Sequence, residues 1–175
     1  MRIAKLLCLT VVLSTTICAR AARVSLNFTS GPAAEDAGQR YEDLSSPVTL
    51  LASFYDAVNS KDYERAFGYW GTPPGAFRDF ARGYADTSGV RLIVEPPTRV
   101  EGAAGSLYAE VPVVLIARRR DNSERVFAGC YVTRRSNLRP TDAPKDEVWR
   151  IHSAKVSPAA SGAAVPKLLA QACGK

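Results

Sequence analysis

Apolar residues in the middle of the chain first recur every three or four positions, which is the spacing of a helix that buries one face. One such stripe covers residues 46–58, where Ser46 can cap the start and Pro47 suits the first helical position. Shorter stripes with the same spacing cover residues 62–70 and 77–84. The pattern therefore predicts three consecutive helices.

The spacing changes at Gly89, after which segments rich in valine and isoleucine are separated by turn residues. These segments predict strands at residues 90–95, 107–119, 125–135 and 148–156. Gly129 lies inside the third of them and predicts a bulge or a bend. Helices followed by a meander of strands indicate an α+β domain, in which three helices pack on one face of a curved antiparallel sheet of about four strands.

The segments on either side of this domain, residues 46–156, have a different composition. Residues 23–45 mix glycine, proline, alanine and charged residues without periodicity, and we interpret them as a flexible spacer. The tail, residues 157–175, is rich in alanine and contains Pro166, which suits the start of a short helix leading to Cys173.

Residues 1–22 have the features of a secretory signal peptide. A basic start is followed by the mostly apolar stretch 6–18 and then by Ala19-Arg20-Ala21. This tripeptide has small residues at the two positions that a signal peptidase recognises. The apolar stretch is well short of the roughly 20 residues that span a bilayer. Lipid attachment at Cys18 is the alternative, but Thr16-Ile17 fits that cleavage poorly. We therefore expect a periplasmic or secreted protein, which contacts the membrane only through this leader or a lipid at Cys18, and a mature chain that starts after Ala21, after Ala22 or at Cys18.

Cysteine content and charge narrow the choice of cofactor and partner. Removal of the leader takes away Cys8 and Cys18, and the remaining Cys130 and Cys173 are expected to form one disulfide. Two distant cysteines and a single histidine do not make a metal site, and we expect no cofactor. The leader also carries three of the positive charges behind the formal net charge of +6, and the modest remainder argues against nucleic acid as a partner.

Three segments resemble the nuclear transport factor 2-like superfamily: residues 50–67 (LLASFYDAVNSKDYERAF), 127–135 (FAGCYVTRR) and 148–154 (VWRIHSA). The resemblance covers residues 47–156 and implies a cone, in which a curved sheet wraps round the long first helix and leaves a pocket at its open end. Members of the superfamily include isomerases, dehydratases and epoxide hydrolases as well as non-enzymatic binding and assembly modules. Many of them pair through the sheet, so a homodimer is one expectation, and the fold leaves the activity open.

A cone pocket would be lined by aromatic and acidic side chains. The candidates for this pocket are Tyr55, Asp56, Trp70, Tyr84 and Glu110. A carboxylate beside a tyrosine is what a ketosteroid isomerase of this fold needs, and a buried carboxylate would be informative. The alternatives are a solvated helix face for Asp56 and an edge or solvent-facing position for Glu110, two residues before Pro112.

The basic residues and the single histidine give weaker signals. Strand alternation places His152 opposite Trp149 and Ile151, away from the expected core, and we assign no catalytic residue. A basic patch is expected at one end of the sheet, formed by Arg118, Arg119, Arg120, Arg134 and Arg135, with Arg139 beyond them. Such a patch could contact anionic lipid headgroups or an acidic partner, or it could simply discourage edge pairing.

Three functions stay open. The first is a non-enzymatic exported domain that binds a small ligand or an envelope protein, which the lack of a coherent acid and base pair favours. The second is an isomerase, dehydratase or hydrolase that uses the cone pocket. The third is an assembly factor of a secretion or envelope machine.

Overall fold

The computed structural model describes residues 40–137, 148–160 and 162–174. The expected signal peptide, most of the expected spacer and Arg139 lie outside these residues. In the described part of the chain three helices come first: α1 (Pro47–Asn59), α2 (Tyr63–Gly68) and α3 (Phe77–Gly83). Five strands and a fourth helix follow: β1 (Thr87–Val94), β2 (Arg99–Ala103), β3 (Ser106–Arg119), β4 (Glu124–Ser136), β5 (Arg150–Pro158) and α4 (Val165–Ala172).

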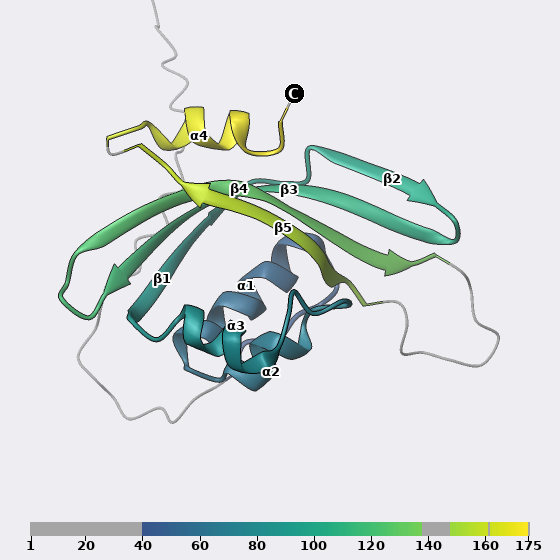
Figure 1. The fold of residues 1–175 in the computed structure, drawn as a ribbon. Helices are drawn as coiled ribbons and strands as arrows, with labels where there is room; N and C mark the ends of the chain where they lie inside the picture. Colours follow the sequence, from purple (N-terminus) through teal and green to yellow (C-terminus); the bar gives the residue numbers. More distant parts are fainter. Residues whose placement is uncertain (1–39, 138–147, 161, 175) are drawn as a thin grey trace, which may run out of the picture. The chain divides into compact units, whose positions relative to one another are not determined.

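The strands form one antiparallel sheet in the order β1-β3-β4-β5, and β2 pairs with the beginning of β3 on the side where β1 pairs with its end. Figure 1 shows α1, α2 and α3 on one face of the curved sheet and α4 on the other. The expected fold class is confirmed. The prediction of about four strands missed β2, because all five of its residues are exposed and only Val100 favours a strand.

The core lies between α1 and the inner face of the sheet. The helix begins at the predicted cap, where the Ser46 hydroxyl accepts the Thr49 N–H and Thr49 Oγ1 accepts the Ser46 N–H, both at 3.1 Å. Its inward side chains are buried: Leu50, Leu51, Phe54, Tyr55, Ala57 and Val58. Alternate residues of β3 complete this core: Ala109, Val111, Val113 and Leu115.

Pro112 lies in the middle of β3, an interior strand, although proline usually marks an edge. Its carbonyl oxygen accepts the Glu95 N–H (3.4 Å), so its nitrogen also faces the side of β1 and β2. On that side Pro112 falls between the residues paired with β1 and those paired with β2, and its missing N–H costs no bond to β4. Glu110 accordingly lies in an interior strand and not at an edge.

Gly129 marks a close approach between two strands. A Cβ at this position would collide with the Lys155 carbonyl oxygen on β5. The irregularity in the pairing of β4 with β5 falls instead between Val132 and Thr133. The bulge suggested for Gly129 is therefore wrong in position, and the glycine is needed because the neighbouring backbone leaves no room for a side chain.

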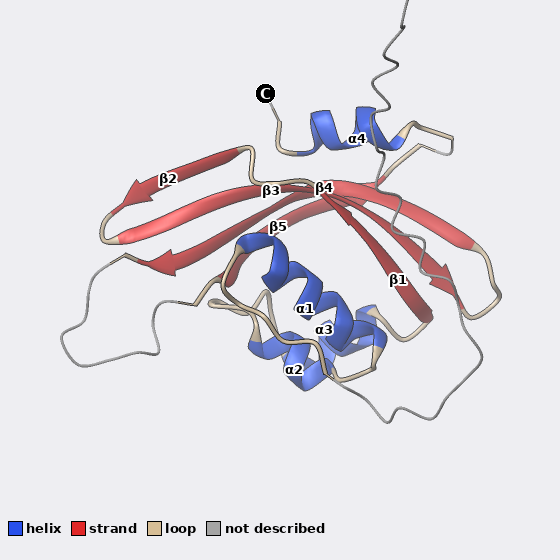
Figure 2. Cartoon of the chain, turned by 180° about the vertical axis from the view of Figure 1, so that it is seen from behind, coloured by secondary structure: helices blue, strands red, loops and turns tan. Residues whose placement is uncertain are grey.

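α4 lies on the outer face of the sheet, opposite α1 (Figure 2). It contacts β3 and β4, buries Leu169, and is joined to β4 by the Cys130–Cys173 disulfide. The expected disulfide is confirmed, as is the short helix that contains Pro166 near its start. Among the described helices, none is long and apolar enough to cross a membrane.

Candidate functional site

A pair of buried tyrosines lies between α1 and the sheet. The hydroxyls of Tyr55 (α1) and Tyr131 (β4) are 2.7 Å apart, and both side chains are buried. Burial raises the pKa of Tyr131 to about 12. Burial, reinforced by the nearby Tyr131 and Tyr84, raises the pKa of Tyr55 well above its usual value. Both phenols therefore stay protonated at neutral pH, and neither can act as a base there.

Three of the five candidate pocket residues gather round this pair. The Phe54 ring lies 4.9 Å from Tyr55 and 6.3 Å from Trp70, measured between centroids. Phe80 from α3 lies 6.2 Å from Phe54 and 5.4 Å from Tyr84. Burial raises the pKa of Tyr84 as well. Tyr55, Trp70 and Tyr84 thus belong to one aromatic cluster that fills the space between the helices and the sheet.

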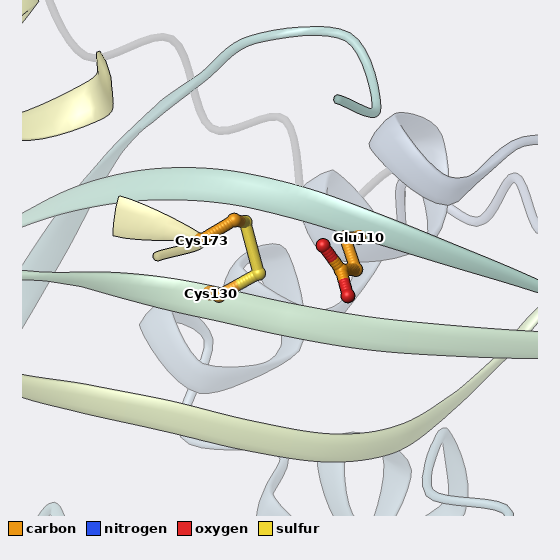
Figure 3. A group of neighbouring side chains, drawn as sticks. All are labelled: Glu110, Cys130 and Cys173. Carbon is orange, nitrogen blue, oxygen red and sulfur yellow. A yellow bond between two sulfur atoms is a disulfide. The ribbon is translucent and has the colours of Figure 1, made fainter. Parts of the chain in front are cut away.

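The two acidic candidates lie elsewhere. Asp56 is on another side of α1, where its Oδ2 accepts a hydrogen bond from Arg65 Nη2 at 2.7 Å. Glu110 projects from the outer face of β3, next to the disulfide (Figure 3), so the sheet separates it from the tyrosines. Within the described residues, neither carboxylate makes a hydrogen bond with a tyrosine.

A cavity of about 470 Å³ opens at the surface where β4 ends and β5 begins. We call this cavity the basic hollow, because its lining includes Arg134, Arg135, Arg150 and His152, beside Gly71 and Thr72 from the loop after α2. No acidic residue occurs in the described part of its lining. Three arginines and one histidine therefore line one opening.

Two of these arginines are direct cross-strand partners. Arg134 on β4 is paired with Arg150 on β5, and like charges at such positions destabilise a sheet. The same row continues through Tyr108 to Glu101 on β2, two strands or about 10 Å from Arg134. Glu101 is itself ion-paired with Arg99 at 2.6 Å. In the described residues, no arginine of the hollow forms an ion pair.

Both members of the pair are held in place by single hydrogen bonds. Arg134 Nε donates to Ser106 Oγ at 3.0 Å, and its guanidinium lies 6.0 Å from the Tyr108 ring centroid. Arg150 Nη1 donates to the Gly68 carbonyl oxygen at 2.7 Å. Since a guanidinium carries five N–H donors, each arginine retains several donors that the described residues do not use.

Arg135 enters the hollow from the opposite face of β4. Its guanidinium lies 5.3 Å from the ring centroid of the buried Trp149. Its Nε is buried and has no hydrogen-bond partner among the described residues. A buried donor of a charged group without an acceptor is costly.

The single basic patch expected from the sequence does not form. Residues 118–120 lie at the turn between β3 and β4, whereas residues 134–135 lie at the other end of this hairpin. Arg134 is paired with Tyr108, which precedes Arg118 by ten residues on β3, so the two groups are about 33 Å apart. Arg118 and Arg119 also form ion pairs, with Glu124 and Asp86. The expectation was wrong because antiparallel pairing puts the two groups at opposite ends.

Arg150 was missed in the sequence, and His152 was not linked to the arginines. His152 is exposed, as alternation predicted, and its ring lies 5.3 Å from that of Tyr108. Alternation also puts Arg150 on the outer face, but only the register of β4 with β5 places it opposite Arg134. The alternation of apolar and polar residues within each strand does not determine how the two strands are aligned with each other, so this pairing could not be predicted.

A second cluster lies on the outer face, beneath α4 (Figure 3). Glu110, Cys130 and Cys173 have ligand atoms within 4.8 Å of one another, and all three line a groove of about 630 Å³ between α4 and the sheet. Both sulfurs are bound to each other, so neither is a thiolate that could coordinate a metal. In this oxidised state the disulfide attaches the end of α4 covalently to β4.

Comparison with known proteins gives matches among solved structures. No family model matches the chain. No curated protein matches it. The chain is similar to a protein of the nuclear transport factor 2-like family from Streptomyces avermitilis, whose description proposes a dehydratase: the identity is 15% over 68% of this chain and 97% of that chain, with a TM-score of 0.46.

Two further solved structures are similar at the same level. A protein of unknown function from Mycobacterium tuberculosis is 17% identical over 69% of this chain and 72% of that chain, with a TM-score of 0.45. A protein from Thiobacillus denitrificans, described as a proposed association domain of calcium/calmodulin-dependent protein kinase type II, is 16% identical over 68% and 99%, with a TM-score of 0.44. The likeness is one of fold. It says nothing of this protein's activity.

Proposed function

We propose that this protein is an exported, non-enzymatic domain that binds a small anionic ligand in the basic hollow. Export is supported by the signal-peptide features of residues 1–22. It is supported further by the Cys130–Cys173 disulfide, because such bonds persist mainly in oxidising compartments.

One observation carries the binding role: Arg134 and Arg150 are partners on the adjacent strands β4 and β5 and line a cavity without a described acidic residue. In the free protein these like charges repel each other. An anion bound in the hollow offsets this repulsion and can accept charge-assisted hydrogen bonds from its arginines. The arrangement is therefore more stable with a ligand than without one.

The aromatic interior favours a structural role over catalysis. An acid–base reaction needs a group that takes up a proton beside one that gives it. Tyr55 and Tyr131 are protonated and bonded to each other. Asp56 is engaged by Arg65, and Glu110 lies across the sheet. These positions support binding over the isomerase, dehydratase or hydrolase alternative.

Native mass spectrometry tests the proposal on protein that its own leader has exported. We expect extra mass that disappears on denaturation, or added mass when small anions are supplied to ligand-free protein. Arg150→Gln should weaken this association. The matched control is Arg91→Gln, which removes the same charge from an exposed position on β1. Absence of any anion adduct would contradict the proposal, as would substrate turnover that Tyr55→Phe abolishes.

A further inference from the structure

We infer that the basic hollow recognises a phosphate group, carried by a soluble phosphate ester or by a lipid headgroup. This inference rests on the proposed function and names the chemical class of the ligand. It follows from the charge, the donors and the accessibility of the hollow.

The charge of the hollow favours a dianion. Arg134, Arg135 and Arg150 give the hollow three guanidinium groups. A single carboxylate would leave two of these three charges without a counterion in the described lining. A phosphate monoester carries roughly two negative charges near neutral pH and offers three acceptor oxygens. It can therefore accept charge-assisted hydrogen bonds from more than one of these arginines.

Two of the arginines are already held by hydrogen bonds, Arg134 to β3 and Arg150 to the end of α2. Arg134 is fixed by Ser106 and Arg150 by Gly68, and each bond uses one donor of five. The Arg135 guanidinium is supported by the Trp149 ring. Guanidinium forks match the spacing of phosphate oxygens, and anchoring reduces the entropy that binding would otherwise cost.

The hollow is open enough for a group that is attached to a larger molecule. Arg134, Arg150 and His152 are all exposed. The volume of about 470 Å³ lies within the usual range of ligand cavities and exceeds what a phosphate group fills. The remaining space suits the organic part of an ester or a headgroup that approaches from a lipid surface.

The test compares two ligands that share a ring and differ in their anionic group, phenyl phosphate and benzoate. In calorimetric titration of the full mature protein, phenyl phosphate should bind at least about tenfold more tightly than benzoate, because it accepts additional charge-assisted hydrogen bonds. Inorganic phosphate should compete with it. Tryptophan emission should change in parallel, because Trp149 contacts Arg135.

Variants at exposed positions locate the site without threatening the fold. Arg134→Gln and Arg150→Gln should each weaken the binding of phenyl phosphate by about tenfold to a hundredfold. Arg150→Lys keeps the charge and loses the fork, so it should also weaken binding. Arg91→Gln should bind like the wild type. Thermal unfolding of each variant confirms that it is folded.

Vesicles distinguish the two sources of phosphate. The protein is sedimented with phosphatidylcholine vesicles that contain or lack phosphatidic acid. Sedimentation that requires phosphatidic acid, is competed by phenyl phosphate and is lost in Arg150→Gln assigns a lipid headgroup. Binding of phenyl phosphate without sedimentation assigns a soluble ester. Either result supports the inference.

Other results overturn it in distinguishable ways. Benzoate binding as tightly as phenyl phosphate, with both weakened by Arg150→Gln, would refute the phosphate class and leave the proposed anion-binding function standing. Binding that Arg134→Gln and Arg150→Gln leave unchanged would show an adventitious ion only. If neither anion binds the wild type, both the inference and the proposed function fail.

Discussion

Replacing Tyr55 with phenylalanine removes one hydroxyl from a buried pair and leaves the Tyr131 hydroxyl without its partner. Each tyrosine is only 4% exposed, so water has little access to the abandoned group. A buried polar group without a partner costs about 1–3 kcal/mol. We therefore expect Tyr55→Phe and Tyr131→Phe each to lower the free energy of unfolding by about this amount.

The double variant should be less destabilised than the two single variants suggest. Replacing both partners by apolar groups of the same shape removes the unsatisfied hydroxyl, which can be nearly neutral. Urea denaturation of the four proteins, followed by circular dichroism, completes a double-mutant cycle. Tyr41→Phe is the matched control, because Tyr41 is 44% exposed and should tolerate the change. If the losses of the two single variants add up to the loss of the double variant within about 0.5 kcal/mol, the two hydroxyls are not coupled and the reasoning is refuted.

Three further perturbations have expected outcomes. Gly129→Ala should destabilise the protein by about 3 kcal/mol or more, because its Cβ would meet the Lys155 carbonyl; Gly68→Ala, which meets nothing within 4 Å, is the control, and equal effects in denaturation would contradict the close approach. Replacing Cys130 and Cys173 with alanine should cost about 4 kcal/mol for the separation of 43 residues and expose the α4 amides to hydrogen exchange; a loss below about 1 kcal/mol would contradict this account. Because the pKa of Tyr131 is raised to about 12, its contribution to stability is complete below pH 10, the usual value, and is lost as the pH rises towards 12. Urea midpoints should fall over that window, and an equal fall in the Tyr55→Phe, Tyr131→Phe double variant would show that other groups are responsible.

Features that depend on neighbours in the sequence were predictable. The cap formed by Ser46 and Thr49 and the helical spacing after it are local, so the start of α1 was predicted correctly. The disulfide followed from the two cysteines that remain beyond the leader. β2 was missed because its exposed residues carry no apolar signal, and its pairing with β3 is what defines it.

Features that depend on register and on layers were not predictable. Arg134 meets Arg150 only because β4 and β5 pair as they do, and the same pairing moves residues 118–120 to the far end of the hairpin. Alternation divides β3 into two faces but does not say which face α1 covers, so Glu110 could be assigned to a pocket that lies on the other side.

The binding of an anion in the basic hollow is tested most directly by mapping amide chemical shifts during titration of the mature protein with phenyl phosphate. We expect the largest changes at residues 134–136, 150–152 and 71–72, which border the basic hollow. We also expect these changes to vanish in Arg150→Gln and to persist in Arg91→Gln. Changes concentrated round Tyr55 and Tyr131, or at residues 118–120, would contradict the account.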